Sequence, residues 1–455
     1  MITAPDRRVF ITGLGVVSAI GSSQSAFWDS CIAGRSRIEE IPHTWHDYYL
    51  PKSRYWSPVA DPSYADYGLR RVDLLSYDKA VLNAIVAADD ALESAGLVKR
   101  LMNEKDGKYS LEYFPPQRSG VFCGSGLGCI TSAFDNYVPH LLGSWSKSAS
   151  LSDDAGTEDV HRPLKVALAH NPRVSPIASL KSMSSSLSAV LSIRYGIRGP
   201  NETVMAACAA GSWAISRGFE SIQNGQLDFA LCGGSEYYGD FAGAIFMAFD
   251  RLGTLVQPSL PTHQANRPFD VARSGFLFSQ GGACMLALET LKSARDRGRR
   301  PFAEILGVAR SSDANSLVAI SQADNSISSM ILSALSSACL QPQDIDYINA
   351  HGTGTIQNDE IEASIIRDLF PHGPLINSTK SLLGHTIGAS GAIEAAVTAL
   401  SLSNQELHGS LNLKDPIGDL NFVRESSRTQ MHHALTHNFG FGGHNVGIVM
   451  GRATE

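Results

Sequence analysis

The chain has 455 residues, of which 43% are hydrophobic, and a formal net charge of -7 at pH 7. This composition is ordinary for a folded globular protein with a large core. The negative charge gives no electrostatic basis for nucleic acid or an anionic membrane as the main partner. No apolar run reaches the roughly 18 residues that a membrane span needs, so we expect a soluble protein.

The seven cysteines are spread from Cys31 to Cys339, and no two of them form a CxxC pair. An odd number of cysteines in a long chain without a signal peptide indicates reduced thiols and a cytoplasmic location. The spacing offers no zinc site, so we expect no bound metal.

Short apolar runs that end in glycine recur along the chain, which is typical of buried strands that lead into tight turns. Four such strands are expected, at 7–21, 120–128, 228–235 and 301–307. Helical patterns lie between them, at 78–95 and 326–340. Strands that alternate with helices predict an α/β fold. The segment 44–69, rich in Tyr, Trp, Pro and Asp, is expected to be a surface excursion.

A faint internal repeat indicates that the fold is duplicated. Cys208 and His385 each stand just before a helix of small residues. We therefore expect two related α/β halves, residues 1–265 with the cysteine and residues 266–455 with the histidines. The active site should lie at their junction, where two helix N-termini converge.

Cys208 is the candidate nucleophile. It lies in Val204-Met-Ala-Ala-Cys-Ala-Ala-Gly-Ser-Trp-Ala-Ile215, where a small-residue helix follows the thiol. The N–H groups at a helix start favour a thiolate and lower the pKa of the thiol. A lone cysteine is more often structural, and we expect that of the other six cysteines. Two histidine turns elsewhere in the chain favour the nucleophile for Cys208.

The two histidines lie in glycine-rich turns, His351 in Asn349-Ala-His-Gly-Thr-Gly-Thr355 and His385 in Leu383-Gly-His-Thr386. Two imidazoles can donate hydrogen bonds to an oxygen that becomes negative during a reaction. Neutral rings with Nε2–H donors suit this task better than imidazolium. The alternative for each is a buried histidine whose hydrogen bonds serve only the fold. Together with a thiol, the pair points to acyl-thioester chemistry.

The motifs and their order resemble those of the elongating β-ketoacyl carrier-protein synthases, condensing enzymes of the thiolase-like fold. The resemblance extends from Arg8 to Met450. It rests on Gly196-Ile-Arg-Gly-Pro200, Ala206-Ala-Cys-Ala-Ala-Gly211, Arg267-Pro-Phe-Asp270, His351-Gly-Thr-Gly-Thr355, Ser378-Thr-Lys-Ser381, Gly384-His385 and Asn438-Phe-Gly-Phe-Gly-Gly-His-Asn445. It implies a five-layer αβαβα architecture made of two duplicated halves.

The resemblance implies a decarboxylative Claisen condensation. Cys208 would accept an acyl group from a phosphopantetheine thioester, as a soft thiolate nucleophile can. Malonyl carrier protein would then lose carbon dioxide, and the enolate would attack the acyl-enzyme carbonyl. His351 and His385 would hold the malonyl thioester carbonyl and stabilise that enolate.

The resemblance also assigns supporting roles. Lys380 would hold the imidazoles electrostatically, with Glu362 as its ion-pair partner, and Asp359 would orient the His351 loop. The alternative for Lys380 is a buried structural salt bridge. The backbone N–H groups of Cys208 and Phe441 would form the oxyanion hole, and the Phe441 ring would act as a gate.

The remaining implications concern the substrate and the partners. Leu127 is expected to touch the acyl pocket. No bound cofactor is implied, because the substrates arrive on the phosphopantetheine of an acyl carrier protein. That carrier protein is the expected partner, together with a second ketosynthase-like chain in a homodimer or a heterodimer.

The chain departs from the family pattern at several positions. Ala206 stands where a Thr is common, Gln280 replaces the acid of a Gly-Glu-Gly turn, and Ile356-Gln357 replaces Pro-Leu. These changes leave every catalytic group in place but alter the residues around it. We hypothesise a specialised polyketide or polyene pathway rather than housekeeping fatty-acid synthesis.

Two other functions remain open. A non-catalytic or chain-length-setting partner of a ketosynthase heterodimer would lack the nucleophile, whereas Cys208, His351 and His385 are all present. A thiolase that acts on coenzyme A would use a second cysteine and one histidine, whereas a histidine follows Gly384. Decarboxylative condensation is therefore the better fit.

Overall fold

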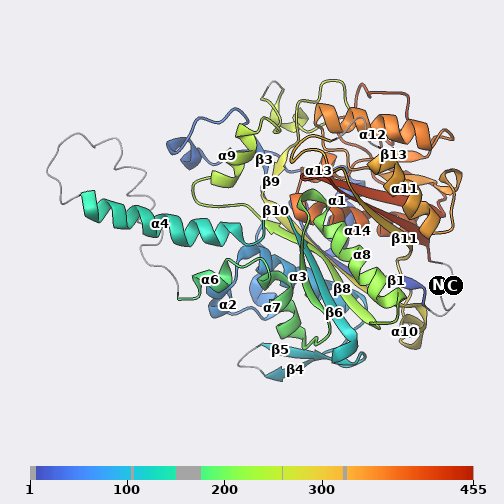
Figure 1. Ribbon diagram of the computed structural model, residues 1–455, viewed down its shortest axis with the longest axis horizontal. Helices are drawn as coiled ribbons and strands as arrows, with labels where there is room; N and C mark the ends of the chain where they lie inside the picture. Colours follow the sequence, from blue (N-terminus) through green and yellow to red (C-terminus); the bar gives the residue numbers. More distant parts are fainter. Residues whose placement is uncertain (1–6, 104–106, 150–175, 259, 321–324, 454–455) are drawn as a thin grey trace.

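The computed structural model describes residues 7–103, 107–149, 176–258, 260–320 and 325–453. Its centre is a ten-stranded sheet with the order β13-β12-β16-β17-β11-β1-β10-β8-β6-β7. Figure 1 shows strands of this sheet running through the middle of the molecule, between helices. One set of five strands comprises β1 (Val9–Val17), β6 (Ser119–Ser125), β7 (Asn201–Met205), β8 (Phe229–Tyr237) and β10 (Gly281–Thr290). The other comprises β11 (Ala303–Ser312), β12 (Tyr347–Asn349), β13 (Leu375–Asn377), β16 (His433–Gly440) and β17 (His444–Arg452).

The two sets of strands have the same pairing pattern. In the first set, β1–β10 and β10–β8 are antiparallel while β8–β6 and β6–β7 are parallel. In the second set, β11–β17 and β17–β16 are antiparallel while β16–β12 and β12–β13 are parallel. The sets meet where β1 pairs with β11. The strand β10 completes the first set, whereas the expected division at residue 265 counts β10 in the second half.

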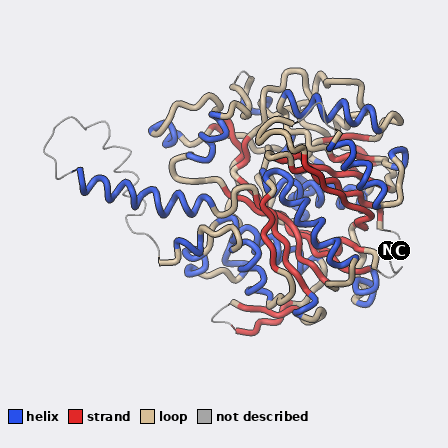
Figure 2. Tube along the Cα trace, viewed as in Figure 1, coloured by secondary structure: helices blue, strands red, loops and turns tan. Residues whose placement is uncertain are grey.

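Helices form three layers around and between the two sets of strands. The outer helices α3 (Lys79–Ser94) and α7 (Ser186–Tyr195) cover the first set, and α11 (Ser326–Ser337) and α12 (Ile356–Leu369) cover the second. Between the sets lie α8 (Ala210–Gln223) and α14 (Ser390–Asn404). Figure 2 shows these helices against the strands. The expected five-layer αβαβα architecture is confirmed.

The other elements are short apart from α4. The helices are α1 (Gln24–Ile32), α2 (Arg71–Ser76), α4 (Ile130–Ala149), α6 (Ala178–Lys181), α9 (Ala244–Arg251), α10 (Leu291–Asp296) and α13 (Lys380–Leu383). The minor strands are β2 (Glu39–Glu40), β3 (Tyr55–Ser57), β4 (Lys99–Asn103), β5 (Lys108–Leu111), β9 (Phe278–Ser279), β14 (Glu406–Leu407) and β15 (Ser427–Arg428). The four predicted strands correspond to β1, β6, β8 and β11, and the two predicted helices to α3 and α11.

The two central helices cross at small residues. A Cβ added to Gly211 of α8 would lie 2.7 Å from the backbone nitrogen of Ala392, and one added to Gly391 of α14 would lie 2.2 Å from the Ser212 hydroxyl. Real Cβ atoms do not approach this closely, so the crossing requires glycine at both positions. It brings the start of α8 beside the start of α14.

The segment 44–69 is only in part the surface excursion that its composition predicted, because it contains both exposed and buried positions. Trp45, Tyr49 and Trp56 are buried, and they pack into one apolar cluster with Phe278 and Cys208. The rings of Trp45 and Trp56 meet edge to face at 5.0 Å. Trp45, Tyr49 and Trp56 are therefore part of the apolar cluster that contains Cys208.

Candidate active site

Cys208 lies in a short 3-10 turn, η4 (Ala207–Ala209), directly before α8. Ala207 has φ +45°, a conformation that residues with side chains rarely adopt, and it turns the chain sharply into the helix. The Cys208 side chain is buried. The backbone N–H groups of Phe441 and Cys208 itself favour its anionic form. These are the two groups expected for an oxyanion hole.

The turn before α14 has the same construction. Ile387 has φ +50°, and the 3-10 turn η7 (Ile387–Ala389) leads directly into the helix. The internal sequence repeat aligned Cys208 with His385. The two turns instead align Ala207 with Ile387, and therefore Cys208 with Gly388. His385 lies just ahead of this turn. The duplication is therefore real, but the nucleophile and the histidine do not occupy equivalent positions.

The pKa of Cys208 differs from the expectation. Burial raises it to about 12, while the charge of Lys380 and the Phe441 N–H act in the opposite direction. The backbone N–H groups do favour the thiolate, as expected, but the net pKa is raised because removing the thiolate from water outweighs the favourable groups around it. The sulfur is a protonated thiol at neutral pH.

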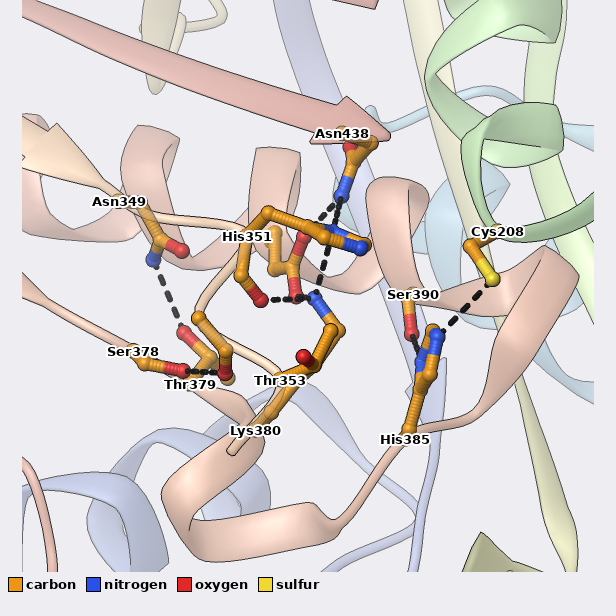
Figure 3. A network of polar contacts seen from close by, with 12 residues as sticks. Cys208, Asn349, His351, Thr353, Ser378, Thr379, Lys380, His385, Ser390 and Asn438 are labelled. Atoms are coloured by element: carbon orange, nitrogen blue, oxygen red, sulfur yellow. Dashed lines mark hydrogen bonds and ion pairs between the residues drawn. The ribbon is translucent and has the colours of Figure 1, made fainter. Parts of the chain in front are cut away.

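His385 faces Cys208, the candidate nucleophile, across the junction of the two halves. Its Nε2 lies 3.0 Å from Cys208 Sγ (Figure 3). Its Nδ1 accepts the backbone N–H of Ile387 at 3.3 Å and lies 2.9 Å from the Ser390 hydroxyl. Because a backbone N–H can only donate, Nδ1 is the acceptor and the ring carries its hydrogen on Nε2. The backbone of Leu277 and Ser279 holds His385 at both its N–H and its carbonyl.

His351 follows β12 and turns its ring toward His385, with 5.6 Å between the ring centroids. Its Nδ1 lies 3.2 Å from Lys380 Nζ and 3.3 Å from Asn438 Nδ2 (Figure 3). Both neighbours are donors, so His351 also carries its hydrogen on Nε2. The two imidazoles thus carry matched N–H donors, and that of His385 lies beside the Cys208 sulfur.

Both histidines are neutral. Burial, the Lys380 charge and the neighbouring ring hold the pKa of His351 well below its usual value, and burial and Lys380 do the same for His385. An imidazolium at either position would sit unsolvated beside an ammonium. The expectation of neutral rings with Nε2–H donors agrees with this geometry.

Lys380 is buried, and its ion-pair partner is Glu394 of α14. Its Nζ also donates to the carbonyl oxygen of His351 at 2.6 Å. The predicted pair with Glu362 is wrong. Glu394 is the one charged residue of α14 and projects into the junction, whereas Glu362 lies on α12 behind the His351 turn.

Glu362 and Asp359 hold the backbone of the His351 turn. Glu362 accepts the N–H groups of His351 at 2.7 Å and Gly352 at 2.8 Å. Asp359 accepts those of Thr353 and Gly354, both at 3.1 Å. Each carboxylate thereby accepts hydrogen bonds from backbone N–H groups that have no other partner in the tight turn. Asp359 does what the sequence predicted, and Glu362 does the same for the first part of the turn.

A cavity of about 260 Å³ opens onto this constellation. Cys208, His351, His385 and Phe441 all line it. Leu127 is not among the described residues that line it; its N–H points toward Glu236 at 3.4 Å. The cavity gives a thioester simultaneous access to the sulfur and to both imidazoles.

Four polar residues of the network were not assigned from sequence: Ser390, Glu394, His437 and Asn438. Glu394 had a signal, since a single acid in an otherwise uncharged small-residue helix needs a buried partner. Asn438 stood inside a recognised motif without a role. His437 and Ser390 had no signal, because only the fold brings them to Glu362 and His385.

Two family models match the chain: Beta-ketoacyl synthase, N-terminal domain, over residues 6–294, and Beta-ketoacyl synthase, C-terminal domain, over residues 302–414. The chain belongs to the β-ketoacyl synthase family. Among its relatives, 3-oxoacyl-[acyl-carrier-protein] synthase 2 of Synechocystis is 31% identical over 98% of both chains. Putative polyketide beta-ketoacyl synthase 1 of Streptomyces cyaneus is also 31% identical over 98% of both.

Two solved structures of β-ketoacyl synthases resemble the fold throughout. A type II polyketide ketosynthase, bound to the hexaketide and in complex with its acyl carrier protein, aligns with TM-score 0.81 and 26% identity, covering 99% of this chain and 100% of that one. The ishigamide ketosynthase/chain length factor aligns with TM-score 0.79 and 27% identity, with the same coverage.

This β-ketoacyl synthase is an acyltransferase that catalyses carrier-protein-dependent condensation in fatty-acid or polyketide biosynthesis. Within the described part of the chain, no group of three or more His, Cys, Asp or Glu side chains is arranged to hold a metal ion. None of the described helices combines the length and the apolar character needed to cross a bilayer.

Proposed function

We propose that Cys208 carries the acyl group and that His351 and His385 act on the malonyl unit. The observation that supports this assignment best is the approach of Cys208 Sγ to His385 Nε2 at 3.0 Å, in a cavity that His351 also lines. The nucleophile and both donors can therefore reach one thioester. A chain that only shapes the pocket of a partner has no need of this arrangement.

In the first half-reaction, the Cys208 sulfur attacks the carbonyl of an acyl thioester. The backbone N–H groups of Cys208 and Phe441 receive the negative oxygen of the tetrahedral intermediate. The carbon–sulfur bond to the carrier then breaks, and the thiol proton ends on the departing phosphopantetheine sulfur. The proton only moves from one sulfur to the other, so the step needs no external base. This suits a thiol whose pKa burial raises to about 12.

In the second half-reaction, malonyl carrier protein enters the same cavity. The Nε2–H groups of His351 and His385 donate to its thioester carbonyl, so that loss of carbon dioxide leaves a stabilised enolate. The enolate carbon attacks the acyl carbonyl and forms the new carbon–carbon bond. The Cys208 thiolate leaves and takes a proton from solvent.

Further residues support these steps. Burial and the charge of Lys380 keep both imidazoles neutral, and Asp359 and Glu362 hold the His351 turn. The Phe441 ring lines the cavity between two glycine-rich stretches and serves as its gate.

We also propose the organisation around the site. Residues 1–265 supply the nucleophile and residues 266–455 the histidines. The substrates are carried on the phosphopantetheine of an acyl carrier protein, no cofactor is bound, and the enzyme works as a cytoplasmic dimer with itself or with a related chain. The carrier protein and the chain length factor in the two solved structures support these partners. The polyketide ketosynthase among them also supports a specialised polyketide pathway.

Intact-protein mass spectrometry with a panel of acyl carrier proteins tests the nucleophile. The wild type should gain the mass of one acyl group, Cys208→Ala should gain none, and Cys339→Ala should behave as the wild type. Cys339 is the exposed cysteine of the chain and the matched control. Acylation of Cys208→Ala at the wild-type level would overturn the assignment.

A further inference from the structure

Asn438 of β16 touches the imidazole of His351 and connects it to both central helices. Its Nδ2 lies 3.3 Å from His351 Nδ1 and 2.5 Å from a carboxylate oxygen of Glu394 on α14. Its Oδ1 accepts the hydroxyl of Ser212 on α8. Figure 3 shows Asn438 above the His351 ring, with its amide nitrogen toward that ring.

These contacts determine how the amide of Asn438 is oriented. A carboxylate can only accept, so the NH₂ group faces Glu394, and the hydroxyl of Ser212 donates to the remaining oxygen. The other N–H of the amide is then directed at His351 Nδ1. That nitrogen must offer a lone pair, which leaves the ring hydrogen on Nε2, toward the cavity.

The adjacent residue acts on the same histidine from the opposite face of the strand. Nε2 of His437 lies 2.6 Å from Glu362, the carboxylate that holds the backbone N–H of His351. Both side chains are fully buried. Successive side chains of a strand point to opposite faces. The strand β16 therefore holds the ring of His351 through Asn438 and its backbone through Glu362.

We propose that Asn438 is a positioning residue that fixes the Nε2–H tautomer of His351 and excludes its protonation at Nδ1. Lys380 also approaches Nδ1, but its ammonium is shared with Glu394 and with the carbonyl of His351. Asn438 supplies a second donor from a rigid strand. The titratable groups that face His351 are Lys380 of α13, Glu394 of α14, Glu362 of α12, His437 of β16 and His385. The consequence for decarboxylation depends on the proposed function, whereas the tautomer does not.

The test combines ring NMR with rates. In ¹⁵N-labelled wild type, the His351 signals, assigned by their absence in His351→Gln, should show the Nε2–H tautomer from pH 6 to 8. In Asn438→Ser the ring should show both tautomers or protonate within this range. The fall in the rate of malonyl decarboxylation at acidic pH should begin about one pH unit higher than in the wild type. At pH 6 the rate should therefore be about tenfold lower. Acylation of Cys208 should stay within twofold of the wild type.

The control is Thr436→Val, a nearly isosteric change at another buried position of β16, and it should match the wild type in both readouts. If Asn438→Ser does not fold, Asn438→Thr, a β-branched residue suited to a strand, should give the same change in tautomer and pH profile. An unchanged tautomer and pH profile, or equal losses of acylation and decarboxylation at every pH, would overturn the proposal. A wild type that shows the tautomer but no decarboxylation would instead count against the proposed function.

Discussion

The sulfur of Cys208 and Nε2 of His385 are 3.0 Å apart, although 177 positions separate the two residues in the chain. The contact joins the turn before α8 to the turn before α14. On the histidine side, the backbone N–H of Ile387 occupies Nδ1 and directs the ring hydrogen toward the sulfur. On the cysteine side, burial keeps the sulfur protonated. The pair is therefore a thiol beside a donor, and it differs from a cysteine activated by a strong histidine base.

Alkylation of Cys208 should report this protonated state. The pKa of the thiol is raised to about 12, so the thiolate fraction grows about tenfold per pH unit below that value. The rate of reaction with iodoacetamide should rise steadily from pH 6 to 8. Peptide mass spectrometry resolves Cys208 from the exposed Cys339, which serves as an internal reference. A plateau below pH 8 would show that the start of α8 forms a thiolate after all.

Glu236 of β8 should make the stability of the fold depend on pH. It is buried beside Ser125 and the N–H of Leu127, and burial raises its pKa to about 8. The folded state binds the Glu236 proton more tightly than the unfolded chain does. The contribution of this carboxyl to the free energy of unfolding is therefore fully present below about pH 4.5 and is lost as pH rises through 8. The loss is at most about 1.4 kcal/mol per pH unit.

Glu236→Gln should remove that dependence. The free energy of urea unfolding at pH 5.5 and 8.5 should differ less in the variant than in the wild type. The variant should also alkylate Cys208 faster above pH 8, because the Glu236 charge raises the pKa of that thiol. Parallel pH dependence in the two proteins would argue against a carboxyl that titrates in this range.

Replacing Lys380 with Met should damage both stability and the pH profile. The change leaves the buried Glu394 carboxylate unpaired, which costs about 3–5 kcal/mol of unfolding free energy. It also removes the charge that lowers the pKa values of His351 and His385, so both rise. Since the neutral rings are the active form, the acidic limb of decarboxylation should move to higher pH.

The double variant Lys380→Met/Glu394→Gln separates the two effects. It removes the unpaired charge, so much of the lost stability should return, while the shifted acidic limb should remain. Chemical denaturation and the pH dependence of carbon dioxide release measure the two separately. A limb that returns to the wild-type position in the double variant would mean that Lys380 acts on the fold alone.

The crossing of α8 and α14 should not tolerate a methyl group. In Gly391→Ala the added Cβ would lie 2.2 Å from the Ser212 hydroxyl and 2.5 Å from Asn438 Oδ1. We expect a loss of about 3 kcal/mol in unfolding free energy and a decarboxylation rate at least tenfold lower. Gly373→Ala is the control, because its Cβ meets nothing within 4 Å and only its φ of +73° costs about 1 kcal/mol. Equal effects of the two changes would contradict the tight crossing.

The proposed reacting groups were predictable because each stands in a local sequence with its own signature. Cys208 before a small-residue helix, and His351 and His385 in glycine turns, identify themselves without knowledge of the fold. The strand and helix patterns likewise predicted β1, α3 and α11. The duplication was visible, although its register was displaced by the few residues that separate His385 from Gly388.

The supporting contacts could not be predicted because they depend on packing between distant segments. Lys380 pairs with Glu394 rather than with Glu362 because α14 enters the junction and α12 does not. The pKa of Cys208 rises because burial, which no local motif specifies, exceeds the effect of the helix start. Trp45, Tyr49 and Trp56 of the segment 44–69 are buried because their rings pack into one cluster with Phe278 and Cys208.

The most direct test of the account is to follow the two half-reactions separately in His351→Gln. Acylation of Cys208 is measured by intact mass, and release of carbon dioxide from labelled malonyl carrier protein is measured on the same sample. The account predicts full acylation with decarboxylation at least a hundredfold below the wild type. Decarboxylation near the wild-type rate, or loss of acylation in parallel with it, would contradict the division of labour between the thiol and the imidazoles.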